Sequence, residues 1–132
     1  MFSHVTIGAS DFSKSFAFYA PLMQRLGQPL KYSDAQTGWA VWKPPLAERP
    51  LFVLAPPFDG RAASPGNGLM TALLAAERAT VDACHALALR HGGSCEGPPG
   101  LRPQYHAHYY GAYFRDPEGN KLCVCCHDAP AQ

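Results

Sequence analysis

Three thiols and an imidazole lie within five residues near the end of the chain, at Cys123, Cys125, Cys126 and His127. The spacing from Cys123 to His127 is C-x-x-C-H, the pattern that attaches a c-type haem. Thiolate and imidazole also suit zinc, so a zinc site built from Cys123, Cys125 and His4 is a second interpretation. The third is that these cysteines act as small apolar residues of a buried strand.

Alternation along a strand decides between these interpretations, because successive side chains point to opposite faces. If residues 120–127 form a strand, Cys123, Cys125 and His127 share one face and Cys126 lies on the other. The two cysteines of the haem pattern then point apart. Residues i and i+2 of a strand are about 6.6 Å apart, so one zinc ion would require adjusted side chains. We expect a buried apolar strand, with some thiol reactivity at Cys123.

A second group of chemically capable residues fills positions 102–113 and comprises Arg102, Tyr105, His106, Tyr109 and Tyr113. Tyrosine and histidine combine an apolar body with a polar tip, which suits a pocket for a small polar or aromatic ligand. Arg102 could bind a carboxylate or phosphate through two hydrogen bonds. The alternative is a lid loop whose aromatic side chains only pack. Trp39 and Phe52 are expected to add apolar walls, with core packing as the alternative for Trp39.

His4 is the best single candidate for a site residue outside these two groups. A neutral imidazole with a pKa near 6.5 can act as a base or donate a hydrogen bond near pH 7. The alternative is a structural histidine on an inward strand face, hydrogen-bonded to a neighbour.

The composition excludes several classes of function. The 132 residues predict one compact domain, and 47% hydrophobic residues are enough for a core. The net charge of +1 provides no basic surface for nucleic acid, and no apolar run approaches the ~20 residues of a membrane span. The opening MFSHVTIGASD lacks the features of a secretory signal. We therefore expect a cytoplasmic protein whose five cysteines are reduced.

The elements that must position these residues follow the same order twice. Residues 2–10 predict a strand, Asp11 caps a helix that ends at Gly27 with Pro21 inside it, and three strands follow at about 29–34, 38–43 and 50–55. A Pro- and Gly-rich linker occupies about 57–67. Residues 68–76 predict a strand, 77–93 a helix, 94–106 a loop, and 108–115 and 120–127 two strands around the turn Asp116-Pro117-Glu118-Gly119.

The two halves align weakly at an offset of 65 residues, which pairs His4 with Leu69. The shared order of elements is the stronger signal. It predicts an α+β fold of two βαβββ modules, about 1–56 and 68–128, whose curved mixed sheet surrounds a cleft with helices outside.

The chain resembles the vicinal oxygen chelate superfamily of glyoxalases, bleomycin resistance proteins and extradiol dioxygenases. The resemblance rests on HVTIGASDFSKSFAFYAPLMQRLG (4–27), GLMTALLAAERATVDA (68–83) and GAYFRDPEGNKLCV (111–124). Metal-dependent members place four ligands on strands that line the cleft. The resemblance implies that these positions fall on His4, near Leu54, on Leu69 and on Cys123.

Leucine offers no donor and the carboxylates are missing, so the hard oxygen and nitrogen ligands of the family's metal chemistry are not expected here. The resemblance thus implies a domain without metal or other cofactor, which binds a small polar or aromatic metabolite in its cleft. The alternative is a metal-independent lyase, isomerase or transferase related to lactoylglutathione lyase. His4 would then be the base, Tyr113 a hydrogen-bond donor and Cys123 a thiol. The resemblance also implies a homodimer.

Overall fold

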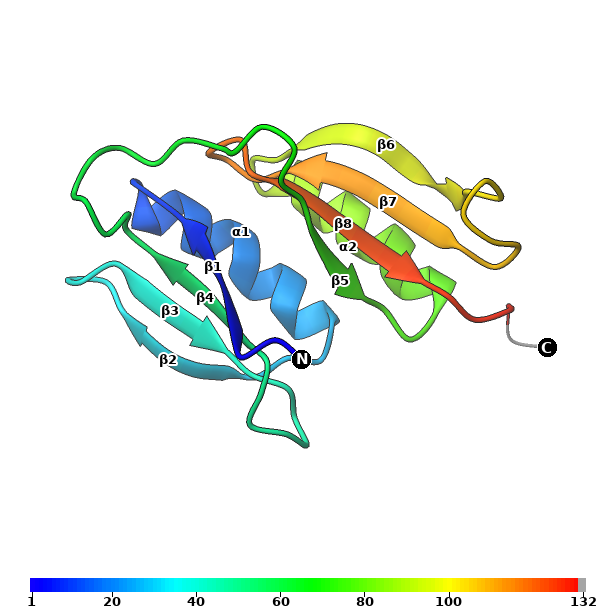
Figure 1. Cartoon of the computed structure of the whole chain (residues 1–132), viewed down its shortest axis with the longest axis horizontal. Coiled ribbons are helices and arrows are strands. Elements are labelled where there is room, and N and C mark those ends of the chain that lie inside the picture. The colour runs from blue at the N-terminus through cyan, green and yellow to red at the C-terminus, as the bar shows by residue number, and fades with distance from the viewer. Residues whose placement is uncertain (131–132) are drawn as a thin grey trace.

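The computed structural model describes residues 1–130, in two halves with the same order of elements (Figure 1). The first half contains β1 (His4–Gly8), α1 (Phe12–Arg25), β2 (Leu30–Asp34), β3 (Trp39–Trp42) and β4 (Leu51–Ala55). The second half contains β5 (Thr71–Leu74), α2 (Arg78–Arg90), β6 (Ser94–Leu101), β7 (Tyr110–Arg115) and β8 (Lys121–Cys126). The predicted pair of βαβββ modules is confirmed. Neither helix in this part of the chain is long and apolar enough to cross a membrane.

Each module forms its own four-stranded mixed sheet, in the orders β1-β4-β3-β2 and β5-β8-β7-β6. The first strand of each module pairs in parallel with the fourth, and the remaining pairs are antiparallel. β1 and β5 therefore occupy equivalent edges of their sheets, and each leaves one side without a strand partner.

Helix α1 forms where the sequence predicts it. Its start is capped by Asp11, whose Oδ1 accepts a hydrogen bond from the Lys14 backbone N at 3.2 Å. It ends at Arg25, just before Gly27, whose positive φ of 73° suits glycine. Pro21 lies inside the helix, which continues for another turn beyond it.

Two predictions for the second module need correction. Residues 94–106 are not a loop, because residues 94–101 form strand β6 on the outer edge of the sheet. The register between β6 and β7 shifts twice, and an edge strand tolerates the prolines Pro98 and Pro99 because one of its sides needs no backbone donors. The predicted strand 68–76 is also shorter, since β5 covers only Thr71–Leu74.

The predicted offset of 65 residues holds where the helices end, since Gly27 and Gly92 both follow them with positive φ, but it is wrong by one at the first strands. The backbone N of Ala9 donates to the Ala55 carbonyl, and Ala75 N donates to the Cys125 carbonyl, both at 2.9 Å. Ala9 therefore corresponds to Ala75, which lies 66 positions further along. The first buried helix positions agree at this offset: Ser15 with Val81, and Phe18 with Cys84. Helix α2 is one residue shorter than α1, which returns the offset to 65 at the helix ends. Few residues are identical between the halves, so the sequence alone could not fix the alignment.

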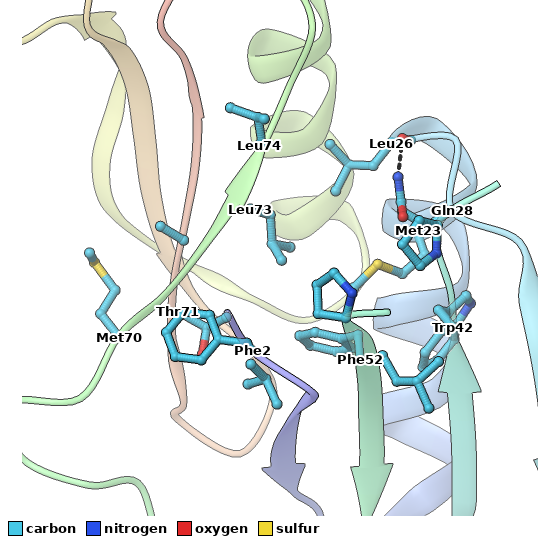
Figure 2. A pocket seen from close by; sticks show the side chains of 15 residues that line it. Phe2, Met23, Leu26, Gln28, Trp42, Phe52, Met70, Thr71, Leu73 and Leu74 are labelled. Carbon is cyan, nitrogen blue, oxygen red and sulfur yellow. Dashed lines mark hydrogen bonds between the residues drawn. The ribbon is translucent and has the colours of Figure 1, made fainter. Parts of the chain in front are cut away.

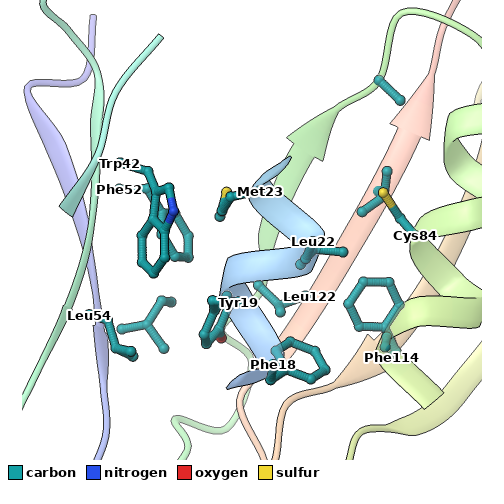
Figure 3. Close-up of a cluster of buried hydrophobic side chains, with 14 of the residues drawn as sticks. Phe18, Tyr19, Leu22, Met23, Trp42, Phe52, Leu54, Cys84, Phe114 and Leu122 are labelled. Atoms are coloured by element: carbon teal, nitrogen blue, oxygen red, sulfur yellow. The ribbon is translucent and has the colours of Figure 1, made fainter. Parts of the chain in front are cut away.

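One hydrophobic core joins the two modules. Figure 3 shows α1 between side chains of the first sheet and those of the second sheet and α2. The Tyr19 ring packs on Phe52 at 5.4 Å between centroids, and Phe18 packs edge-on against Phe114 at 6.1 Å. A buried aromatic side chain of this kind stabilises the fold by roughly 3 kcal/mol or more. Helix α1 is thus shared between the two modules.

The turn after β7 fastens the second module to the first. The buried Asp116 carboxylate accepts hydrogen bonds from the Tyr19 hydroxyl at 2.6 Å and from the backbone N atoms of Glu118 and Asn120 at 2.9 Å. The Asn120 side chain donates to Asp116 and to the Gly8 carbonyl, which ends β1. These contacts give the D-P-E-G-N sequence a structural role and fix where β8 begins.

Candidate functional site

The two sheets each present one face to the core and one face away from it. In the second sheet, Leu122, Val124 and Cys126 join the core, so Cys123 and Cys125 point the other way. The predicted alternation along residues 120–127 is therefore confirmed. Cys126 is an apolar core residue, and the two cysteines of the haem pattern lie on opposite faces.

Tyr109 covers the outward-pointing thiols of β8. Its hydroxyl lies 2.9 Å from the Tyr113 hydroxyl and 3.6 Å from Cys123 Sγ. Cys123 is 0% exposed as a result, although it lies on the face away from the core. Burial raises the pKa of both tyrosines, so their hydroxyls stay protonated and can donate hydrogen bonds.

Gly111 makes this arrangement possible. A Cβ at this position would lie 2.9 Å from Cε1 of the Tyr109 ring and 3.4 Å from the Cys125 Cβ. Real side chains do not approach that closely, so only glycine lets the ring lie over β7 and reach the thiols.

A chain of hydrogen bonds links Cys125 to two histidines. Cys125 Sγ lies 3.4 Å from His127 Nε2, and His127 Nδ1 lies 2.8 Å from His106 Nε2. The backbone N of His108 donates to His106 Nδ1 at 3.2 Å. We call Tyr109, Tyr113, Cys123, Cys125 and His127 the thiol face.

The pKa values of the two cysteines of the thiol face shift in opposite directions. The neighbouring Cys123 thiol has the largest influence on the pKa of Cys125 and lowers it, burial opposes this change, and His127 lowers the pKa further, to about 6. The Cys125 thiol, together with burial, raises the pKa of Cys123 well above its usual value. Cys125 is therefore the thiol that ionises near neutral pH, and Cys123 stays protonated beside it.

Several predicted ligand-binding residues gather around the thiol face. The Arg102 guanidinium lies over the Tyr113 ring at 5.5 Å, and its Nη2 donates to the Pro98 carbonyl at 2.8 Å. The rings of Tyr105 and Tyr109 are 4.9 Å apart. The Arg102 guanidinium is thus hydrogen-bonded to backbone carbonyls of β6. A carboxylate ligand would have to compete with these hydrogen bonds for the predicted binding to Arg102.

An apolar cavity of about 500 Å³ lies between the first sheet and β5, next to the end of α1 (Figure 2). Phe52 lines it, as the sequence predicted for a ligand-binding wall, together with Phe2, Met23, Trp42 and Leu73. The exposed Trp39 lies at the start of β3 and is not among the lining residues. The cavity extends to Ala72 and Leu74 of β5, which pair in register with Cys123 and Cys125. Its outer wall is therefore one strand away from the thiol face.

His4 does not join these groups within one chain. It is exposed on β1, and its Nδ1 lies 3.0 Å from the hydroxyl of Ser3. Of the three proposed catalytic residues, Tyr113 and Cys123 come together through Tyr109, whereas His4 belongs to the other sheet.

The residues at the family's metal positions do not fit a metal ion held by hard donors. With the corrected offset, His4 corresponds to Met70 rather than Leu69. Cys123 corresponds to Val53, because Cys125 corresponds to Ala55. The set therefore holds one imidazole, one thiol, one thioether and one hydrocarbon. Within residues 1–130, no group of three or more His, Cys, Asp or Glu side chains is placed to hold a metal, including the zinc site considered for Cys123, Cys125 and His4.

Cys125 and His127 are the site residues that the sequence analysis did not select. Alternation placed them on the same face as Cys123, which was a usable signal. Their importance depends on His106 reaching His127 across the sheet and on Gly111 admitting Tyr109, and neither contact can be read from spacing along the chain.

Comparisons with known proteins agree with this architecture. The family model described as Glyoxalase/Bleomycin resistance protein/Dioxygenase superfamily matches residues 1–124. A glyoxalase/bleomycin resistance protein from Albidiferax ferrireducens T118 is 34% identical, with a TM-score of 0.82 over 97% of this chain and 99% of that one. No curated protein matches the chain.

Two more distant structures share the fold. A lactoylglutathione lyase from Agrobacterium tumefaciens is 19% identical, with a TM-score of 0.62 over 96% of this chain and 92% of that one. TnmS3, an antibiotic binding protein from Streptomyces sp. CB03234, is 22% identical, with a TM-score of 0.64 over 97% and 96% of the two chains. At these identities the likeness concerns the fold alone.

Proposed function

The chain belongs to the glyoxalase/bleomycin resistance protein/dioxygenase superfamily, and we propose that it binds a small polar or aromatic metabolite between its two modules without using a metal. The observation that carries this proposal is the cavity of about 500 Å³ beside β5. Cavities of roughly 300–1,000 Å³ with mostly apolar walls are typical of small-molecule sites.

The walls of the cavity favour a flat, largely apolar ligand. Phe2, Trp42 and Phe52 offer ring surfaces, and Gln28 and Thr71 add polar groups at the rim. Aromatic pairs gain about 0.5–1.5 kcal/mol beyond the area they bury, so an aromatic ligand would gain most here. TnmS3 is named as an antibiotic binding protein, which is consistent with a binding role on this fold.

Filling the cavity from its rim tests this proposal without disturbing the core. Ala72 is exposed and lines the cavity, so Ala72→Trp should weaken the binding of a ligand found in a thermal-shift screen of aromatic and polar metabolites at least tenfold. Ala79→Trp places the same side chain on the exposed side of α2, away from the cavity, and should leave affinity unchanged. Equal affinity in both variants would show that the ligand does not occupy this cavity.

The second candidate function is a metal-independent lyase, isomerase or transferase. The observation in its favour is that Tyr109 joins the protonated Tyr113 to Cys123, one strand away from the cavity wall. Mass spectrometry of the ligand before and after incubation separates the two functions. A binding protein returns the ligand unchanged, whereas conversion over many turnovers would establish the enzyme.

We further propose that two copies associate through β5. β5 is an edge strand, and Leu69, Met70 and Leu74 on and beside it are exposed, Leu74 to 71%. A second copy would bury this apolar surface and could bring His4 of the partner subunit towards the thiol face. Leu74→Lys should produce monomers in sedimentation equilibrium, while Leu46→Lys at another exposed leucine should not. A wild-type monomer at micromolar concentration would contradict the proposal.

A further inference from the structure

We propose that Cys125 is a thiolate nucleophile, held by a hydrogen bond from His127, that forms a covalent adduct with small soft electrophiles such as α,β-unsaturated carbonyl compounds. This activity goes beyond the proposed binding function, because it requires no ligand in the apolar cavity.

The direction of the hydrogen bonds supports the thiolate. A backbone N can only donate, so the bond from His108 N to His106 Nδ1 makes that ring nitrogen an acceptor. The proton of a neutral His106 is then on Nε2 and points to His127 Nδ1, 2.8 Å away. His127 in turn carries its proton on Nε2, which faces Cys125 Sγ at 3.4 Å.

This series of hydrogen bonds through His106 and His127 places an N–H donor, and not a basic nitrogen, against the Cys125 sulfur. The pKa of Cys125 falls to about 6, and the neighbouring Cys123 thiol, which stays protonated, is the largest influence on it. The stacked rings of His106 and His127, 5.1 Å apart at 26°, hold the relay in place. His106 is thus a positioning residue, and His127 contacts the reacting atom.

Burial opposes the ionisation of Cys125, but no neighbouring charge on the adjacent strands adds to that opposition. From β5, the register partner of Cys125 is Leu74, which carries no charge, and from β7 it is Gly111. Tyr109 lies over Gly111 as a protonated phenol, because burial raises its pKa. No carboxylate is hydrogen-bonded to any of these groups among residues 1–130.

The surroundings define the electrophile. Cys125 is 5% exposed, whereas His127 beside it is exposed, so the thiolate is reached past His127 by a small molecule. Thiolates favour soft carbon electrophiles, and the rings of Tyr105 and Tyr109 favour apolar ones.

The reaction requires no oxidant or metal. The Cys125 sulfur forms a bond to the β-carbon, and the carbon–carbon π bond breaks. Its electron pair moves towards the carbonyl as an enolate. The α-carbon then takes a proton from water, which leaves as hydroxide, and His127 keeps its Nε2 proton.

The molecule contains its own comparator for this chemistry. Cys95 Sγ lies 3.2 Å from His85 Nε2, so it is also a cysteine–histidine pair, and unlike Cys125 it is exposed. In that pair no second histidine orients the ring, and burial lowers the pKa of His85. Cys95 therefore shows how an exposed cysteine–histidine pair reacts without this relay.

The test is the rate at which N-ethylmaleimide modifies each cysteine of the whole chain, measured by fragment mass spectrometry between pH 6.5 and 8.5. With a pKa of about 6 for Cys125, its rate should change less than about twofold, because most of the thiol is already ionised. A small free thiol such as N-acetylcysteine is the reference, and its rate should rise about 50-fold over the same range, because a free cysteine thiol has a pKa near 8.5.

Substitutions of the histidines identify which side chains keep Cys125 ionised. His127→Phe keeps a ring but removes the donor, so the rate at Cys125 should become strongly pH-dependent, rising more than tenfold. His106→Ala should move the profile in the same direction by a smaller amount. His108→Phe is the matched control, because His108 takes part through its backbone N only, and its profile should match the wild type. Cys125→Ser should abolish the fast reaction.

Three results would overturn the proposal: a pH slope at Cys125 as steep as that of the free thiol, modification at Cys123 in its place, or a His127→Phe profile identical to the wild type. Each of these can occur whether or not the cavity binds a ligand, so failure here is distinguishable from failure of the proposed binding function.

Discussion

The two sheets agree on the face that meets the core and differ on the face that points away from it. Phe52 and Leu54 of β4 are buried apolar residues, as are their counterparts Leu122 and Val124 of β8. On the opposite face, the pair Val41 and Val53 of the first sheet corresponds to Tyr113 and Cys123 of the second.

This difference shows where each half is free to vary. Core faces must fill a shared interior with apolar atoms, so both halves keep the same kind of residue there. The outward faces have no such requirement. The first carries hydrocarbon and an isolated His4, while the second has gathered thiols, phenols and imidazoles into one hydrogen-bonded group. We infer that any chemistry of this chain is concentrated in its second half.

The largest expected effect on stability comes from Asp116, whose hydrogen bonds join the two modules. Asp116→Ala leaves the Tyr19 hydroxyl and two backbone donors without their buried acceptor, which should lower the free energy of unfolding by about 3–5 kcal/mol. Urea unfolding provides the measurement. Asp59→Ala is the control, since the exposed Asp59 accepts only a local bond from Arg61 N, and it should change stability by less than about 0.5 kcal/mol. Similar losses in both variants would show that the turn does not join the modules.

Gly111→Ala should disrupt the thiol face of the second sheet and leave the outward face of the first sheet unchanged. The new Cβ displaces the Tyr109 ring, so we expect a loss of about 1–3 kcal/mol and much faster modification of Cys123 by a thiol reagent. Ala107→Ser, in the exposed part of the β6–β7 connection, should change neither quantity. If Cys123 stays protected in Gly111→Ala, another residue must cover it.

The ionisation of Cys125 predicts a pH dependence of stability that the first sheet lacks. The folded pKa of about 6 lies below the ordinary thiol value, so the unfolded chain binds more protons between about pH 6 and 8.5. Stability should therefore rise with pH in this window, by about 1–2 kcal/mol between pH 6.5 and 8, and be lost as the pH falls through 6. Urea unfolding of the wild type and Cys125→Ser at several pH values isolates this contribution. Parallel curves for the two proteins would contradict it.

The smallest effect is expected on the first face. His4 is exposed and bonded only to the neighbouring Ser3, so His4→Ala should change stability by less than about 0.5 kcal/mol. It should also leave the pH profile of Cys125 modification unchanged in a monomer. If the protein is a dimer and His4→Ala changes the pH profile of Cys125 modification, the same substitution should have no effect in the monomeric Leu74→Lys background. That pair of results would show that the His4 imidazole reaches the thiol face of a second copy.

Much of the fold was predictable because it depends on local patterns. Asp11 before an apolar stripe predicted α1, and the turn at Asp116–Gly119 with its flanking β-formers predicted β7 and β8. β6 was missed because its glycines and prolines resemble a loop, and only pairing with β7 at the edge of the sheet makes them a strand. The offset between modules was missed by one residue because the halves share an architecture and few identities.

The sequence by itself determined the two βαβββ modules and the shared face of Cys123, Cys125 and His127, because strand alternation is a local property of the backbone. It also supplied most of the aromatic residues that surround that face. Only the tertiary structure decided that Cys125 rather than Cys123 ionises. That choice depends on which thiol lies against His127, which is in turn hydrogen-bonded to His106 of the β6–β7 connection, and on the neighbouring thiol beside it. The pKa of this thiol depends on contacts with residues far away in the chain, and such contacts cannot be predicted from sequence spacing.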